Sequence, residues 1–266
     1  MVGGLIFNLA ALAALVTAAL MHRRAEYARD TVFWAALGVA AAGALSWSAA
    51  LLAGEWHTGL AAALWVSVAT SLVVFMVLAA LSAETWRLTP LLMPYLMLLA
   101  IVATVWAQAP ARPLPAAVPP TWLVVHIVAS VLTYALMTIA AVAALAVALQ
   151  ERALKHKKPI GRARLLPSVA GCEELLIRLL AASEIVLGAG LLTGMATQYV
   201  TDGRLITFEH KTLFAVLAFV VIGLLLIAHR RTGVRGRRAA RVVLLAYLFL
   251  TISYPGVKFV TDVLLV

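Results

Sequence analysis

Cysteine and charged residues are scarce in this sequence. A single cysteine, Cys172, excludes an internal disulfide and any Cys-x-x-Cys-His attachment motif. Charged residues fill only 12% of the 266 positions, whereas soluble domains carry about 25%. The phosphate-binding loop, the HExxH zinc helix and the GxSxG nucleophile elbow are absent as well. The chain therefore has too little polar material to coat a water-soluble globule, and no set of catalytic residues is expected.

Apolar residues dominate instead. They make up 64% of the sequence, and the mean hydropathy is +1.03. Long runs rich in Ala, Leu and Val predict membrane helices, because a helix satisfies its own backbone hydrogen bonds where water is missing. The alternating polarity of a membrane β-barrel is not visible. We therefore predict an all-α, polytopic membrane helix bundle with about eight transmembrane helices. The expected spans are residues 2–20, 32–52, 60–81, 88–107, 122–149, 175–197, 212–228 and 242–257.

Residues 1–266 are expected to form a single integral membrane domain. It would consist of a four-helix half over 1–107 and a second four-helix half over 122–266. A proline-rich connection, 108–121, links the two and should be extended. The connection 151–174 is basic and then weakly apolar, which is consistent with a short helix on the membrane surface and places Cys172 in a loop.

Lys and Arg residues are distributed unevenly between the connections. Arg23 and Arg24 follow the first span and no Lys or Arg precedes it, so we expect a retained helix rather than a cleaved signal peptide. Connections on the same side as Arg23 hold most of the basic residues. By the positive-inside rule, both termini should be extracytoplasmic in a bacterial inner membrane. The net charge of +10 then reflects topology and contact with the lipid bilayer, and nucleic-acid binding is not expected. The basic residues predicted outside are Arg112, Arg204, Lys211 and Lys258.

Histidine is the only residue type that offers a plausible set of metal ligands. His126 lies about one turn inside an apolar span, where an unpaired polar side chain is costly, so a partner or a ligand is expected for it. His57 and His210 are predicted near the same outer surface, and His22, His156 and His229 near the inner one. A solvated or interfacial position is an alternative interpretation for each of these.

His210 and His229 bracket the seventh span. About 18 residues of helix separate them by roughly 27 Å, which is nearly the whole hydrocarbon thickness. If both bind metal, two sites are required. The outer site would draw on His126 or His57, and the inner site on His22.

Glu184 is the acidic residue predicted deepest within a span. A carboxylate there must face the bundle, be protonated or find a partner. It either reaches back toward Arg178 or an internal water, or it forms a proton or ligand site. Nearby Gly188, Gly190 and Gly194 predict close helix packing.

Three stretches of the second half carry a resemblance to a known family. They read HIVASVLTYALMTIAAVAALAVALQERALK at 126–155, EELLIRLLAASEIVLGAGLLTGMA at 173–196 and HRRTGVRGRRAARVVLLAYLFLTISYPGVKFV at 229–260. In this order they resemble the cytochrome c assembly family, the group that includes CcsA, CcmC and HemX. In length and span number, the chain is most similar to YpjD-type members of that group.

The resemblance implies haem handling: binding, transport or delivery of haem across the membrane, alongside other cytochrome-assembly proteins. His126 falls on the first histidine that flanks the family's haem segment, and His229 on a histidine that CcsA proteins carry at the inner side. The tryptophan-rich segment itself is replaced by QYVTDGRLITFEHKT at 198–212, in which His210 is a candidate replacement ligand. The second flanking histidine is absent from the end of the sequence. A non-haem regulator or assembly factor of the same fold, as in HemX, is the open alternative.

Overall fold

The described part of the chain is almost entirely helical. The computed structural model describes residues 2–24, 28–53, 57–82, 84–107, 112–113, 120–155, 165–203 and 210–261. Strand structure in these residues is limited to one antiparallel pair of two residues each, β1 (His57–Thr58) and β2 (Arg112–Pro113). The predicted all-α class is confirmed. The long helices are α1 (Val2–Ala19), α2 (Thr31–Leu52), α3 (Leu60–Leu81), α4 (Thr89–Val105), α5 (Pro120–Lys155), α6 (Val169–Asp202), α7 (His210–Thr232) and α8 (Gly236–Thr251).

Most of these helices are able to span a bilayer. Within the described residues, seven are long and apolar enough to cross a membrane, from Thr31–Leu52 to Gly236–Phe259. In α1 the apolar stretch Gly4–Ala19 is shorter than these seven spans. Apolar side chains such as Phe7, Ile185 and Leu224 are more than half exposed, as expected for groups that face lipid rather than water. The chain is a multi-pass membrane protein.

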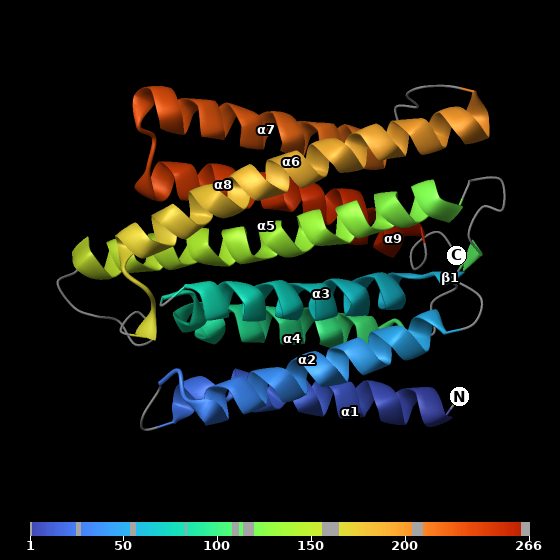
Figure 1. The fold of residues 1–266 in the computed structure, drawn as a ribbon, viewed down its shortest axis with the longest axis horizontal. Helices are drawn as coiled ribbons and strands as arrows, with labels where there is room; N and C mark the ends of the chain where they lie inside the picture. Colours follow the sequence, from blue (N-terminus) through green and yellow to red (C-terminus); the bar gives the residue numbers. More distant parts are fainter. Residues whose placement is uncertain are drawn as a thin grey trace.

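The helices pack in two groups joined by α5. Helices α1 to α4 contact one another, and α5, α6, α7 and α8 form a second set in which α6 and α8 lie against α5 (Figure 1). Helices α3 and α4 contact α5 across the boundary. Because α5 is covered on both sides, every residue of the run from Ala135 to Ala144 is buried. The core is therefore continuous from one group to the other.

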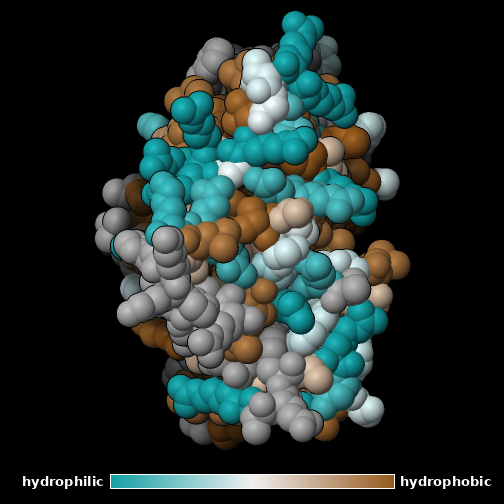
Figure 2. All heavy atoms as spheres, turned by 90° about the vertical axis from the view of Figure 1, so that its left-hand side faces the viewer, coloured by the Kyte–Doolittle hydropathy of each residue, from teal (hydrophilic) through white to brown (hydrophobic). Residues whose placement is uncertain are grey.

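One end of the bundle is basic. The last turns of α1, α3, α5 and α7 and the first turns of α2, α4, α6 and α8 lie there, while the start of α1 and α9 (Val257–Phe259) lie at the opposite end (Figure 1). Seen from the basic end, hydrophilic side chains spread over much of the surface (Figure 2). The exposed basic residues described at this end are Arg23, Arg29, Arg87, Arg152, Lys155, Arg230, Arg231, Arg235, Arg237, Arg238 and Arg241.

An ion pair orders the start of α2 at the basic end. Asp30 caps this helix by accepting a 2.8 Å hydrogen bond from the backbone N–H of Phe33, and its carboxylate pairs with Arg24 at 2.9 Å. The hydrogen bond from Arg24, followed by the one from Phe33, lowers the pKa of the Asp30 carboxyl below its usual value.

The orientation of the bundle is a prediction that reporter fusions test. A periplasm-active reporter fused after Val266 should be active, and the same reporter fused after Arg164 should be inactive, because the basic end is expected to stay in the cytoplasm. Both fusion points lie outside the described residues. The reverse pattern of activity would contradict the assigned orientation.

Helices α5 and α6 extend well beyond their predicted spans. The helix α5 has 36 residues and continues to Lys155, and α6 has 34 residues and begins at Val169. The described ends of the connection 151–174 prolong α5 and α6, and the surface helix expected within it falls on residues 156–164, which lie outside the described part. Hydropathy detects only the apolar section, whereas charged residues such as Glu and Arg continue a helix readily into water.

Cys172 lies on the first turns of α6 and not in a loop. Its side chain is 1% exposed and packs in the core, and the side chain of Ser168 caps the helix just before it. The loop position predicted for Cys172 is therefore wrong, because the apolar span begins several residues after the helix does.

The last membrane helix changes its winding near its end. After α8 ends at Thr251, residues Ile252–Gly256 form a π-helical turn that contains Pro255, and α9 follows. Proline lacks the N–H needed for a regular helical bond, and its ring displaces the carbonyl four residues earlier. Gly256 accommodates this carbonyl, since an added Cβ would lie 3.0 Å from the oxygen of Thr251. The turn widens the helix where Ser253 and Tyr254 project, and such turns are frequent at functional sites.

Candidate functional site

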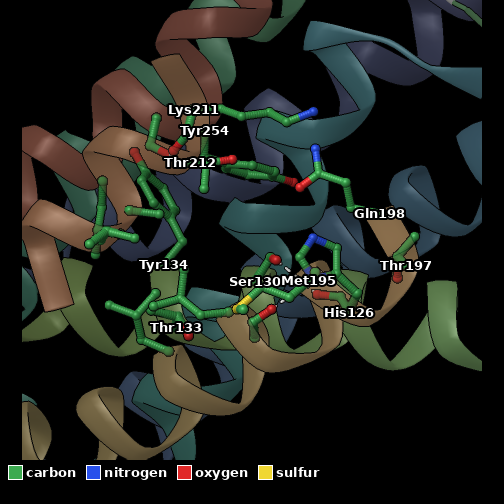
Figure 3. Close-up of a pocket in the computed structure, with 18 of the residues that line it drawn as sticks. His126, Ser130, Thr133, Tyr134, Met195, Thr197, Gln198, Lys211, Thr212 and Tyr254 are labelled. Carbon is green, nitrogen blue, oxygen red and sulfur yellow. Dashed lines mark hydrogen bonds between the residues drawn. The ribbon is translucent and has the colours of Figure 1, made fainter. Parts of the chain in front are cut away.

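A cavity of about 500 Å³ opens near the end of the bundle opposite the basic end. Its size is in the range of small-molecule and cofactor sites. Its wall is largely apolar, with polar groups from four segments of the second half (Figure 3). The lining residues are Leu123, His126, Ser130, Thr133 and Tyr134 of α5; Leu187, Gly190, Leu191, Gly194, Met195, Thr197 and Gln198 of α6; Lys211, Thr212, Ala215 and Val216 of α7; and Leu250, Ser253 and Tyr254 of α8 and the π turn.

His126 is held by the backbone of α6. Its Nδ1 lies 3.0 Å from the carbonyl oxygen of Gly190 and 3.4 Å from the hydroxyl of Thr193. A carbonyl oxygen only accepts, so Nδ1 carries the hydrogen and Nε2 keeps its lone pair. The partner expected for this intramembrane imidazole is thus a helix carbonyl, and the lone pair of Nε2 is not used by this bond. This is the arrangement of metal-bound histidines, whose second nitrogen commonly donates to a carbonyl.

Gly194 makes room for the imidazole. A Cβ built on Gly194 would lie 3.0 Å from Cε1 of His126, closer than ordinary contact, and 3.4 Å from Nδ1. The sequence predicts close helix packing at the glycines of α6. At Gly194 the close contact is between the backbone of α6 and the imidazole ring of His126. Gly188 packs against Phe219 of α7 instead.

Tyrosines connect the cavity to the first helix group. The ring of Tyr134 lies 5.8 Å from that of Tyr254 and 5.6 Å from that of Tyr247, measured between centroids. The hydroxyl of Tyr95, on α4, is hydrogen-bonded to those of Tyr134 and Tyr247, and Tyr247 also bonds Thr138 at 2.9 Å. This network fixes the inner wall of the cavity, because the hydroxyls of Tyr95, Tyr134 and Tyr247 each have a partner.

The remaining predicted ligands lie elsewhere. His210 is exposed at the first residue of α7 and does not line the cavity, although the two residues after it do. His229 lies at the basic end, where its Nδ1 bonds the carbonyl of Val234 at 3.0 Å and closes the turn between α7 and α8. The side chains of His57 and His22 lie outside the described part of the chain. The structure thus brings one of the predicted histidines, His126, to the cavity.

Glu184 lies where α6 meets α7. Its Oε1 occupies space beside Gly223, where an added Cβ would approach it to 2.9 Å, and its buried Oε2 has no hydrogen-bond partner among the described residues. Arg178 pairs with Glu174 one turn earlier, so the suggested contact between Glu184 and Arg178 is not formed. The position of Glu184 deep in the bundle is as the sequence predicts, but its partner is not Arg178.

Several cavity residues were not singled out from the sequence. Lys211, Gln198, Met195 and Tyr254 all line the cavity, and only Lys211 had been noted, as a basic residue outside. The SYPG stretch that contains Tyr254 carries a recognisable signal, since a proline inside a membrane helix marks a local break in its hydrogen bonding. Met195 and Gln198 carry no such signal.

Comparison with known proteins assigns the chain to a family. The sequence profile described as "Cytochrome C assembly protein" matches residues 56–265, which include every described residue of the cavity. The chain belongs to the cytochrome c assembly family. Membership in this family supports a role in cytochrome c biogenesis.

A relative from Azospirillum brasilense extends the similarity to the whole chain. It is described as "Uncharacterized 28.8 kDa protein in nifR3-like 5'region" and is 52% identical over 266 residues, covering 98% of each protein. No solved structure matches the chain significantly. The similarity to this relative thus covers 98% of the chain and includes most of the segment before residue 56, where the family profile begins.

Proposed function

We propose that this cytochrome c assembly protein binds haem in the cavity, with Nε2 of His126 as the iron ligand. The observation that carries the proposal is the tautomer: the Gly190 carbonyl takes the Nδ1 hydrogen, so the lone pair of Nε2 is available to a metal. His126 is also the histidine that falls on the family's first haem-flanking position. The proposed role is to bind haem and to pass it on within the membrane during cytochrome assembly.

The residues present fit such a group. The porphyrin supplies the equatorial ligands, so the protein must provide axial ligands and an apolar slot. His126 supplies an axial imidazole, and Gly194 keeps the space against its ring open. The thioether of Met195 and the phenols of Tyr134 and Tyr254 line the same cavity and belong to ligand types known for haem iron. Among the described residues no group of three His, Cys, Asp or Glu residues is placed to hold a bare metal ion.

The cavity residues have separate tasks in this proposal. Bound haem would supply the redox-active iron that cytochromes require. His126 would hold the haem iron, and the Gly190 carbonyl fixes the direction of the imidazole. Leu123, Leu187 and Leu191 exclude water from the ring. We propose that this end of the bundle is extracytoplasmic in a bacterial inner membrane, where other cytochrome-assembly membrane proteins would receive haem.

Haem titration of the purified protein tests this function. The protein, extracted in a mild neutral detergent, should develop a Soret band that saturates at an equimolar ratio of haem to chain. The band should have the form of imidazole-ligated haem. A protein that is colourless when isolated from haem-replete cells, and that gives no saturable band with added haem, would contradict the proposal and favour the non-haem regulator.

A further inference from the structure

The polar groups of the cavity are unevenly charged. Within the described residues, Lys211 is the charged side chain of the lining, and no carboxylate contributes to it. The other polar lining groups, such as Gln198, Thr212 and Ser253, are neutral. A site with low-dielectric walls and one cation has a positive potential, which favours anionic ligands over neutral ones.

Lys211 is positioned by the π turn of the last span. The hydroxyl of Ser253 donates a 2.6 Å hydrogen bond to the backbone carbonyl of Lys211, which ties the start of α7 to residues Ile252–Gly256. Lys211 is the second described residue of the 23-residue helix α7 and lines the cavity, so its cation lies at the end of this helix that borders the cavity.

This cationic side faces the proposed iron ligand across the cavity. His126 and Lys211 both line this cavity, from α5 and α7 respectively. In the close-up, the side chains of His126, Gln198 and Lys211 point toward the same space (Figure 3). His126 lies one to two turns inside α5, whereas Lys211 lies at the very start of α7 and is exposed. The imidazole is thus the deeper group and the ammonium the group at the mouth.

We propose that Lys211 forms an anion-recognition end of the cavity, which binds the carboxylates of the tetrapyrrole and directs them toward the mouth. The proposal rests on haem binding at His126 and adds the orientation and charge of the ligand. The site selects an amphipathic, dicarboxylate tetrapyrrole and discriminates against a neutral one. Ser253 acts as a positioning residue, since it holds the backbone of Lys211 and does not itself reach for the ligand.

Titration with two ligands and three variants tests this recognition. The ligands are haem and its dimethyl ester, which keeps the iron and the ring but lacks the negative charges. The variants are Lys211→Gln, Lys211→Arg and, as a matched control on the exposed far end of the same helix, Arg230→Gln. Each affinity is compared with that of the wild type for the same ligand, so that partition of the ester into detergent micelles cancels.

Lys211→Gln should weaken haem binding about tenfold, the size expected for one charge-assisted hydrogen bond, and leave binding of the ester unchanged. Lys211→Arg and Arg230→Gln should bind both ligands as the wild type does. The inference is overturned if Lys211→Gln weakens both ligands equally or neither of them. A wild type that binds neither ligand contradicts haem binding itself, so the two failures are distinguishable.

Discussion

Replacing His126 by alanine is expected to abolish stoichiometric haem binding. Its imidazole is the only one among the described cavity residues, and the variant leaves the Gly190 carbonyl and the apolar wall in place. Removing a group that only hydrogen-bonds to a metal-bound histidine lowers metal affinity about 10- to 100-fold. Removing the ligand itself should therefore lower haem affinity about 100-fold or more. Haem titration followed at the Soret band measures the effect, and an unchanged thermal unfolding curve would show that the fold is intact.

Chemical rescue makes the His126 experiment specific. In His126→Gly, added imidazole should fill the vacated space and restore the spectrum of imidazole-ligated haem. His229→Gly is the matched control, because this histidine lies at the basic end and bonds the Val234 carbonyl. Its haem content should equal that of the wild type. Loss of haem from His229→Gly, with retention in His126→Gly, would place the ligand at the inner site and contradict the assignment.

The second large effect is expected from Gly194→Val. A Cβ on residue 194 would already lie 3.0 Å from the imidazole, and the two methyl groups of valine extend beyond it. The ring must then leave the Gly190 carbonyl, and its Nε2 loses the preset direction. Haem affinity should fall about tenfold or more, as for other losses of support around a metal-bound histidine. Gly194→Ala should show a smaller decrease in the same direction.

Gly38→Val is the matched control for residue 194. Gly38 lies in the middle of α2, and nothing stands within 4 Å of a Cβ built on it. Haem titration and thermal unfolding should both match the wild type in this variant. If Gly194→Val binds haem with wild-type affinity, the imidazole does not need its present position against α6, and the proposed ligand geometry is wrong.

The fold could be predicted from the sequence because membrane helices are long and locally determined. Span Leu60–Leu81 was predicted at its exact bounds, since apolar runs end there at both sides. The ends of α5 and α6 were not, because helix continues into water where hydropathy gives no signal. The π turn around Pro255 was missed for a related reason: a hydropathy profile reports apolarity and not winding.

The candidate site was predictable only in part. His126 was expected to have a partner because a polar group one turn inside a span must be satisfied, and the structure supplies the Gly190 carbonyl. The rotation of α7 about its axis leaves His210 exposed and turns Lys211 toward the cavity. Packing of α7 against α6 and α8 determines this rotation, and the sequence alone does not give it. The role of Gly194 likewise requires knowing which side chain of α5 lies opposite it.

A cryo-electron microscopy map of the haem-loaded protein tests the central claim most directly. The account predicts planar density in the cavity between α5, α6 and α7, with the metal joined to Nε2 of His126 and the carboxylates on the side of Lys211. Haem density beside His229 at the basic end, or a saturated sample whose haem lies outside the cavity, would contradict it.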